Sequence, residues 1–196
     1  MISNHGYLML KSVCDFILAI FILLLTSPLI LLCCLFIKLE SNGSAFYLQE
    51  RLGIGGRTFH IIKLRSMFID AEKNGAQWAE KNDTRVTRIG AFIRKKRIDE
   101  LPQLINVLKG DMALIGPRPE RPVFVDEFSR EIPDFKKRLV VKPGITGWAQ
   151  VNGGYDLSPK EKLELDFYYI QNLNIGIDLK IVVRTIKVIF SGAGAR

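Results

Sequence analysis

Two adjacent carboxylates, Asp99 and Glu100, are the residues of this chain best suited to chemistry. Basic residues at 94–97 precede them, and a short apolar helical pattern at 101–108 follows and ends at Gly110. The acids therefore fall where a helix begins, and a helix N-terminus favours bound phosphate because it presents unpaired N–H groups and a positive dipole end. The basic residues are expected to lower the pKa of both acids, which would keep them ionised and ready to attack or to hold a metal.

A purely structural interpretation of the same residues is open. Asp99 would then be a helix N-cap, Glu100 an acid that compensates the helix dipole, and the basic run a solvated face. Pro102 fits either interpretation, because a proline in the first turn of a helix loses no hydrogen bond. These residues alone do not decide between the two.

The composition limits the classes of chemistry. The chain of 196 residues carries a formal net charge of +8, which favours nucleic acid, acidic lipid or phosphorylated substrates as partners. Its two histidines, His5 and His60, have no partners at the spacing of a zinc site or a Ser-His-Asp triad. The three cysteines, at 14, 33 and 34, lie in or beside an apolar segment and form no disulfide framework. Carboxylates remain as the reactive groups that the composition favours.

Residues 16–37 are 22 consecutive uncharged positions, enough to reach across a bilayer core. Ser27-Pro28 stands at their centre, where proline kinks or breaks a helix. Both flanks are basic, with Lys11 before the run and Lys38, Arg51, Arg57 and Lys63 after it. Basic flanks favour the cytoplasm, so a re-entrant helix-break-helix and an ordinary kinked transmembrane helix both stay open. We expect a membrane anchor at 1–40 and a second domain at 41–196.

The second domain begins with a predicted hairpin. Strands are expected at 45–48 and 58–62, joined by a turn with glycines at 53, 55 and 56. Such a turn is only weak support for a phosphate loop. Lys63 and Arg65, at the end of the second strand, could face an anion or be solvated strand-end charges.

Amphipathic helices are predicted at three further places. The pattern at 83–98 has a strongly basic face that includes Arg94 and could lie on anionic lipid. A capped helix is expected at 158–172, and a helix with a wide apolar face at 175–190, fit to dock on the core or on lipid.

Two loops stand out. A short strand at 111–115 leads into a proline-rich loop at 116–122, whose fixed backbone would hold Arg118 ready for forked phosphate recognition. A plain surface loop is the alternative. The turn-rich loop at 143–148 ends in Trp148, which could stack on a nucleobase, rest at the membrane surface or pack in the core.

Taken together and in order, these motifs resemble the bacterial sugar transferase family, the monotopic polyprenyl-phosphate phosphoglycosyl transferases. The resemblance runs from Lys11 to Arg196 and is carried by Ser27-Pro28, Gln49-Glu50-Arg51-Leu52-Gly53, Lys63-Leu64-Arg65-Ser66-Met67, Thr87-Arg88-Ile89-Gly90, Asp99-Glu100-Leu101-Pro102-Gln103-Leu104, Asn106-Val107-Leu108-Lys109-Gly110-Asp111-Met112, Gly116-Pro117-Arg118-Pro119-Glu120, Pro143-Gly144-Ile145-Thr146-Gly147 and Ala149-Gln150-Val151-Asn152-Gly153.

The resemblance implies an α/β fold, in which a re-entrant helix precedes a compact catalytic domain of helices and short strands with surface amphipathic helices. It implies transfer of sugar 1-phosphate from a UDP-sugar to undecaprenyl phosphate, with release of UMP. Asp99 is then the nucleophile that forms an aspartyl phosphosugar, Glu100 its metal or acid/base partner, and both acids help to hold Mg²⁺. The substrate or phosphate contacts that we expect are Lys63, Arg65, Arg94, Arg118, Arg121, Lys142, Gln150 and Asn152.

The chain departs from the family pattern in places. Gly154 stands where the family usually has an arginine, so an anion contact there could come from Lys142 or Arg121 instead. Basic residues at 96 and 97 replace a commonly small, hydroxyl-bearing pair and could lower the pKa of the acids further. Larger members carry a membrane bundle and a further domain before this region, so we expect this chain to correspond to the catalytic core.

The expected setting is the cytoplasmic face of a bacterial inner membrane, with membrane lipid as a partner, a homodimer as a possibility and no nucleic acid bound. The product would start an exopolysaccharide, capsule or O-antigen. The ending at 192–196 resembles members that use hexoses such as galactose or glucose, and an N-acetylhexosamine is the other expectation. Two other functions compete: a membrane-anchored basic module that binds acidic lipid or nucleic acid, and a hydrolase of nucleotide sugars.

Overall fold

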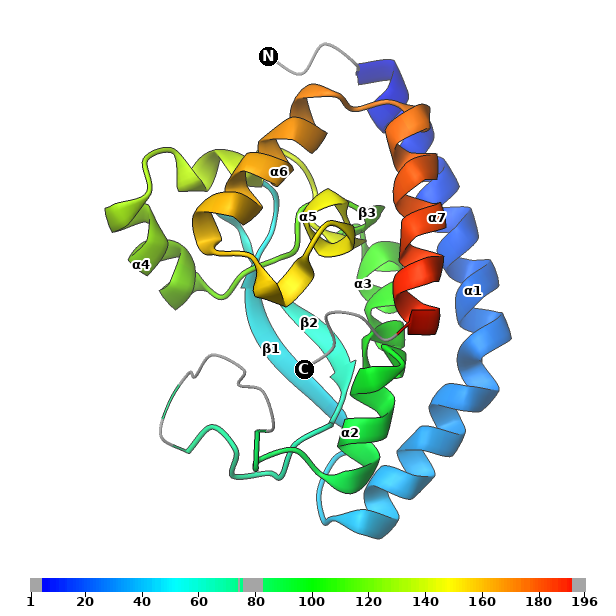
Figure 1. The fold of residues 1–196 in the computed structure, drawn as a ribbon. Helices are drawn as coiled ribbons and strands as arrows, with labels where there is room; N and C mark the ends of the chain where they lie inside the picture. The colour runs from blue at the N-terminus through cyan, green and yellow to red at the C-terminus, as the bar shows by residue number, and fades with distance from the viewer. Residues whose placement is uncertain (1–4, 74, 76–82, 192–196) are drawn as a thin grey trace.

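The structure is a computed structural model and describes residues 5–73, 75 and 83–191. Its first element, α1 (His5–Glu40), is one helix of 36 residues that contains Pro28. The expected break into two helices at Ser27-Pro28 is therefore wrong in the structure, although the helix bends along its length (Figure 1). Pro28 has no N–H for the carbonyl of Leu24, and the hydroxyl of Ser27 donates to that carbonyl at 2.9 Å instead. This substitute donor lets the helix continue through the proline.

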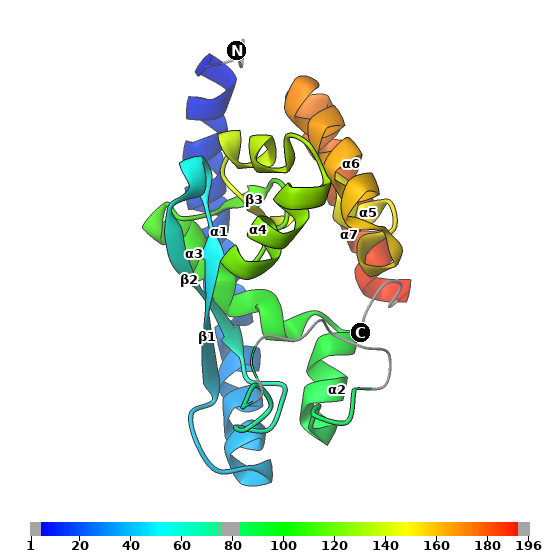
Figure 2. The same ribbon diagram turned by 90° about the vertical axis from the view of Figure 1, so that its left-hand side faces the viewer.

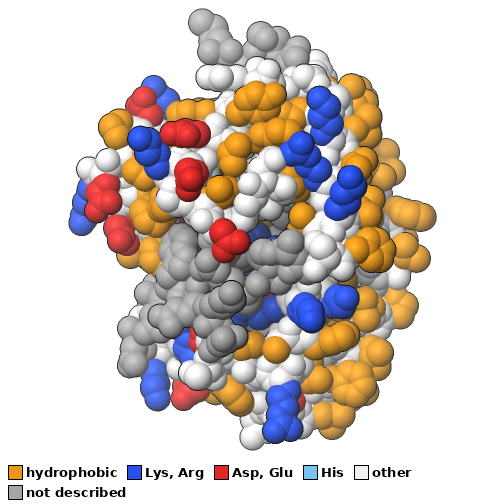
Figure 3. All heavy atoms as spheres, viewed as in Figure 1, with side chains coloured by type: hydrophobic (Ala, Val, Ile, Leu, Met, Phe, Trp, Pro, Cys, Tyr) orange, Lys and Arg blue, Asp and Glu red, His pale blue; other side chains and the backbone are white. Residues whose placement is uncertain are grey.

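One side of α1 packs against the rest of the described chain along nearly its whole length. It contributes to three of the four core clusters, with residues that include Tyr7 and Leu8, then Ala19, then Ile30, Cys33 and Ile37. The other side is exposed and apolar, and Figure 3 shows these side chains along one edge of the molecule. By length and by a mean hydropathy of 2.9, α1 is the one described helix that could cross a membrane.

The predicted hairpin is confirmed and is longer than expected. Strands β1 (Phe46–Leu52) and β2 (Thr58–Leu64) pair antiparallel, and a 3₁₀ turn, η1 (Ile54–Gly56), joins them. Gly55 adopts a φ of +65° in this turn, which only glycine adopts readily. The glycines therefore serve the turn.

Three short helices follow the hairpin: α2 (Arg88–Lys95), η2 (Ile98–Gln103) and α3 (Leu104–Lys109). Helix α2 is shorter than the predicted 83–98, because Thr87 caps its start by accepting from the N–H of Gly90 at 2.9 Å. Its end is fixed by Arg97, whose φ of 57° is left-handed and cannot continue a helix.

The remaining elements complete the domain beyond the hairpin (Figures 1 and 2). They are β3 (Ala113–Ile115), α4 (Pro122–Glu131), η3 (Phe135–Val140), β4 (Gly144–Thr146), α5 (Trp148–Val151), η4 (Gly154–Asp156), α6 (Pro159–Gln171) and α7 (Ile175–Ser191). The start of α7 contacts the start of α1 through Asp178 and Tyr7. The capped helix predicted at 158–172 is confirmed as α6, and its cap is a capping box formed by Ser158 and Glu161.

Strand β4 lies where only a loop was expected. It pairs in parallel with β3, and this pairing is possible because glycine stands at the contact. A Cβ on Gly144 would come within 2.0 Å of the backbone nitrogen of Gly116. The described chain thus has two two-stranded sheets among helices, which confirms the expected mixture of helices and short strands. The C-terminal ending used as a hint about the sugar lies outside the described residues.

Candidate active site

Asp99 and Glu100 lie in the first turn of η2, directly after the left-handed turn at Arg97. That turn reverses the chain at the end of α2 and directs both acids inward, so that each is only 8% exposed. Neither side chain caps the helix. The interpretation of Asp99 as an N-cap is therefore wrong.

The two carboxylates have different neighbours. Oε1 of Glu100 accepts from the Arg118 guanidinium at 2.6 Å and lies 3.7 Å from Nζ of Lys63. Within the described residues, the carboxylate of Asp99 takes part in no hydrogen bond or ion pair. The side chain of Asp99 is thus available to a ligand, whereas that of Glu100 is held.

The same neighbours separate the pKa values of the pair. Burial and the adjacent charge of Glu100 raise the pKa of Asp99 to about 6, although Lys63, Arg94 and Arg118 oppose the shift. Burial would also raise the pKa of Glu100, but Arg118 and Lys63 outweigh it and hold that pKa below its usual value. The expectation that both pKa values are lowered is right for Glu100 and wrong for Asp99, because burial was invisible in the sequence.

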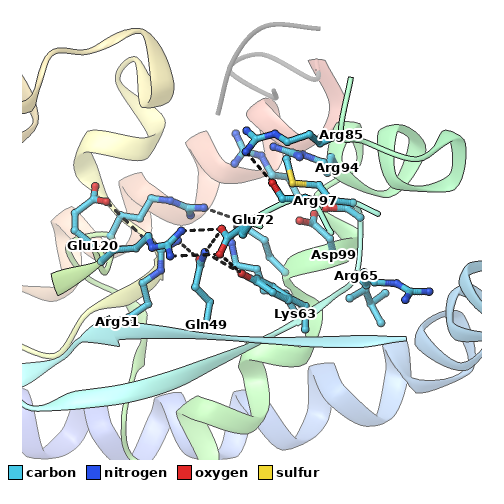
Figure 4. A pocket seen from close by; sticks show the side chains of 18 of the residues that line it. Gln49, Arg51, Lys63, Arg65, Glu72, Arg85, Arg94, Arg97, Asp99 and Glu120 are labelled. Carbon is cyan, nitrogen blue, oxygen red and sulfur yellow. Dashed lines mark hydrogen bonds and ion pairs between the residues drawn. The ribbon is translucent and has the colours of Figure 1, made fainter. Parts of the chain in front are cut away.

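Both acids line a cavity of about 320 Å³ between the hairpin, η2 and the proline-rich loop (Figure 4). Ten of the described lining side chains are Lys or Arg, and four are Asp or Glu. Its lining also contains aromatic and aliphatic side chains such as Phe68 and Ile69. A cationic cavity with a part-apolar wall suits a polyanion that carries an organic group.

The structure brings some of the predicted contact residues together at the acids. Lys63 and Arg118 touch Glu100, and Arg94 lines the cavity beside Asp99. Gln150 also lines the cavity, although its amide atoms are buried.

Arg65 and Arg121 lie at the cavity but are engaged elsewhere. Arg65 points away from the acids in Figure 4, and its guanidinium donates to the carbonyls of Ser41 at 2.8 Å and Asn42 at 2.6 Å. Arg121 pairs with Glu72 through both carboxylate oxygens, at 2.7 Å and 3.3 Å. Arg65 therefore holds the turn after α1, and Arg121 holds the segment that contains Glu72.

Lys142 and Asn152, in contrast, are not among the residues that line the cavity. Asn152 donates to the carbonyl of Trp148 at 2.7 Å and accepts from Arg184 of α7. The structure does not place Lys142 or Asn152 at this cavity, and their role as substrate contacts stays a prediction.

Trp148 packs in the core, which was one of its three interpretations. Its ring stacks on Tyr168 with centroids 5.5 Å apart, and the Arg184 guanidinium lies 4.7 Å from its centroid. It does not line the cavity, so nothing in this arrangement places it against a nucleobase.

Comparison with known proteins agrees with this site. The sequence model described as "Bacterial sugar transferase" matches residues 6–192. The chain belongs to the bacterial sugar transferase family. This confirms the resemblance on which the sequence analysis relied.

Individual bacterial sugar transferases are similar over most of this chain. A UDP-N-acetylgalactosamine-undecaprenyl-phosphate N-acetylgalactosaminephosphotransferase of Aeromonas hydrophila is 52% identical over 193 residues, which are 97% of this chain and 46% of that protein. A UDP-glucose:undecaprenyl-phosphate glucose-1-phosphate transferase of Caulobacter vibrioides is 44% identical over 181 residues, 90% of this chain and 68% of that protein. A galactosyl transferase of Streptococcus agalactiae is 41% identical over 169 residues, 80% of this chain and 37% of that protein. The chain thus spans about half the length of the first of these sugar transferases.

Several cavity residues escaped the sequence analysis of this sugar transferase. Arg51, Glu120 and Arg138 were not predicted, and Arg97 was counted only within the basic run. Arg51 and Glu120 stand inside motifs quoted for the family, which was the available signal. Arg138 lies in no such motif, and only the tertiary structure brings it to the cavity.

The expected Mg²⁺ site of this sugar transferase depends on which side chains could bind the ion. No group of three or more Asp, Glu, His or Cys residues that could hold a metal occurs in the described ranges. Mg²⁺ in enzymes is, however, often bound by one or two carboxylates together with substrate phosphates. Asp99 and Glu100 are such a pair in a cationic cavity, so the residues present fit that mode of binding.

Proposed function

We propose that this chain transfers sugar 1-phosphate from a UDP-sugar to undecaprenyl phosphate, releases UMP and so starts a surface polysaccharide. The observation that carries the proposal is the buried carboxylate of Asp99, which pairs with no side chain in the described ranges and lies in a cationic cavity of a bacterial sugar transferase. The names of the Aeromonas and Caulobacter relatives support both the donor class and the lipid acceptor.

In the proposed first step, a carboxylate oxygen of Asp99 attacks the sugar-bearing β-phosphorus of the donor. The bond from that phosphorus to the oxygen bridging the two phosphates breaks, UMP leaves with the electron pair, and an aspartyl phosphosugar remains. In the second step, a phosphate oxygen of undecaprenyl phosphate attacks the same phosphorus and releases the Asp99 carboxylate. Two half-reactions at one nucleophile predict ping-pong kinetics.

The residues around Asp99 support distinct roles. Lys63, Arg94 and Arg118 would bind the diphosphate and balance charge that shifts to the leaving phosphate. Glu100 is kept ionised by Arg118 and Lys63. It is therefore suited to orient these cations and to bind a metal ion. Mg²⁺ held by Asp99 and Glu100 would neutralise part of the diphosphate charge.

We further propose that α1 does not cross the membrane and that both of its ends lie on the cytoplasmic face of the inner membrane. Tyr7, near its start, and Ile37, near its end, both pack against the same domain. A helix that crossed the bilayer could not keep both ends against a domain on one side. The exposed apolar side of α1 would instead lie in lipid (Figure 3). A homodimer stays a prediction.

The proposal is tested by UMP release from purified protein with UDP-N-acetylgalactosamine, UDP-glucose and UDP-galactose, each with and without undecaprenyl phosphate. With the right donor alone we expect one UMP per enzyme, and continuous release only when the acceptor is added. Asp99→Asn should lower release by at least about 10³-fold because it removes the nucleophile. Asp126→Asn, at an exposed ion pair on α4, is the matched control and should leave the rate unchanged.

Three outcomes would contradict the proposal. Continuous UMP release without the lipid would favour the nucleotide-sugar hydrolase. No release from any donor would favour the basic binding module. Donor-treated protein whose Asp99 peptide gains no sugar phosphate mass, while glycolipid still forms, would exclude the covalent intermediate.

A further inference from the structure

The proline-rich loop that carries Arg118 is held by its carbonyl groups. Four consecutive carbonyls accept hydrogen bonds from four different places: Pro117 from the N–H of Gly144 at 2.9 Å, Arg118 from the Arg138 guanidinium at 3.0 Å, Pro119 from the Arg51 guanidinium at 3.0 Å, and Glu120 from the N–H of Leu52 at 3.0 Å. Every carbonyl of the segment is thus fixed from outside it.

The sequence of the loop explains why carbonyls do this. Pro117 and Pro119 have no N–H, so the loop can neither form a regular helix nor pair fully as a strand. It follows strand β3 and continues the contact with β4 at Gly116 and Pro117. Beyond Pro117, the carbonyls of Arg118 and Pro119 are held by the two guanidinium groups, and the carbonyl of Glu120 is held by the N–H of Leu52.

These two guanidinium groups are buried and charge-balanced. The Arg138 side chain is 3% exposed, and one of its terminal nitrogens lies 2.6 Å from Asp166, whose side chain is 1% exposed. The other terminal nitrogen lies 3.9 Å from Glu120, and Arg51 approaches the same carboxylate at 3.7 Å. Buried ion pairs contribute little to stability compared with apolar packing. Stability alone therefore does not explain why arginines stand at these two positions. A guanidinium can reach a carboxylate and a carbonyl at once.

Arg118 is the residue that this arrangement orients. Its own carbonyl is held by Arg138, the next carbonyl is held by Arg51, and its guanidinium donates to Glu100 at 2.6 Å. Three hydrogen bonds therefore hold its backbone and its guanidinium in place before any ligand binds.

We propose that Arg138 and Arg51 are positioning residues, which hold the backbone on either side of Arg118 and so aim its guanidinium at the reacting diphosphate. This inference rests on the proposed function. The competing explanation is that Arg138 only joins η3 to α6 through Asp166 and the Phe135 ring, 5.2 Å from its guanidinium.

The test measures UMP release from the donor alone, because its amplitude counts folded sites and its rate constant reports the chemistry. Arg138→Gln combined with Asp166→Asn removes both charges and keeps the net charge and approximate volume. We expect the rate constant to fall roughly 10- to 100-fold with the amplitude kept, the size typical of misplaced catalytic groups. The matched control, Lys136→Gln with Asp126→Asn, removes an exposed ion pair of 3.0 Å between η3 and α4 and should change neither quantity.

A double-mutant cycle with Arg118→Ala separates positioning from general stability. If Arg138 acts through Arg118, the paired substitution should lower the rate constant less than about 3-fold once Arg118 is absent. The same fold-loss in both backgrounds would overturn the inference. A loss of amplitude with an unchanged rate constant would also overturn it, because the pair would then serve the fold alone.

A second variant covers the case in which the paired substitution does not fold. The Arg51 side chain is 14% exposed, and Arg51→Gln removes its hold on the Pro119 carbonyl together with its contacts to Glu120 and Gln49, while Arg138 and Asp166 stay unchanged. We expect a rate constant about 10-fold lower at full amplitude, and an unchanged rate constant would contradict the inference. If the unsubstituted protein released no UMP, the proposed function would fail first. If UMP were released but the double-mutant cycle with Arg118→Ala were additive, only the positioning role would be contradicted.

Discussion

At the scale of residues, two neighbouring acids acquire different chemistry from their surroundings. Arg118 and Lys63 touch Glu100 and hold it ionised. Asp99 lies one residue away and is equally buried, no cation of the described residues contacts it directly, and its pKa is raised to about 6. The division resembles other carboxylate pairs whose environments separate their roles. The acid with the higher pKa is the one that remains available to attack.

The raised pKa predicts the acid limb of the rate profile. The proposed attack by Asp99 needs its ionised carboxylate, so the rate of UMP release should rise as pH increases through about 6 rather than about 4. Arg94 lowers the pKa of Asp99, so Arg94→Gln should move this limb to higher pH by roughly half a unit to one unit. Lys95→Gln, an exposed position on the same helix, is the control and should not move it. Equal profiles for both variants would contradict the electrostatic explanation.

At the scale of elements, a buried polar cluster attaches the start of α1 to the domain. Nζ of Lys11 lies 3.2 Å from both Asp15 and Asp178, and the hydroxyl of Tyr7 donates to Asp178 at 2.7 Å. Asp178 lies near the start of α7 and also accepts from Tyr169 of α6 at 3.0 Å. Three helices therefore meet at one set of charges, beside the apolar contacts of Tyr7.

Removing the cation from this cluster should weaken the fold strongly. Lys11→Met leaves Asp15 and Asp178 close together and without their shared cation, and such a loss costs about 3–5 kcal/mol. The free energy of unfolding in detergent, measured against Ser12→Ala on the exposed side of the same helix, checks this. A Lys11→Met protein as stable as the Ser12→Ala control would show that apolar packing alone holds α1.

At the scale of the whole molecule, α1 behaves as a part of the domain rather than as a stalk. Its buried residues contribute to three core clusters, from Tyr7 to Ile37, and the domain covers one side of it throughout. Its exposed side is apolar, as is much of the exposed side of α7. The cavity lies on the other side of the hairpin from α1, so a membrane against α1 would leave the cavity facing away from the bilayer (Figure 4).

The arrangement predicts where the two ends of α1 lie. In a protein whose three cysteines are replaced by alanine, single cysteines at Gly6→Cys and Arg57→Cys should both react with a membrane-impermeant maleimide only in inside-out vesicles. Gly6 has open space around it, and Arg57 lies in the exposed hairpin turn. Reaction of the Gly6→Cys protein in intact spheroplasts would mean that the helix spans the membrane.

The sequence by itself determined the features that depend on a few neighbouring residues. The hairpin, the capping box at Ser158, the amphipathic helix at the C-terminal side and the acid pair at the start of a helix were all predictable. Turn chemistry, capping and hydrophobic period act over one or two turns of chain, so they are legible without a fold. Order and spacing of motifs were also enough to name the family.

Only the tertiary structure decided which charges meet and which are buried. Lys63 and Arg118 reach Glu100 from distant parts of the chain, whereas Asn152, also polar in the sequence, bonds to the scaffold at Trp148. The pKa of Asp99 rises because desolvation depends on what packs around a side chain, and not on its neighbours in sequence. Pairing through space and removal from water are consequences of packing, which no local pattern contains.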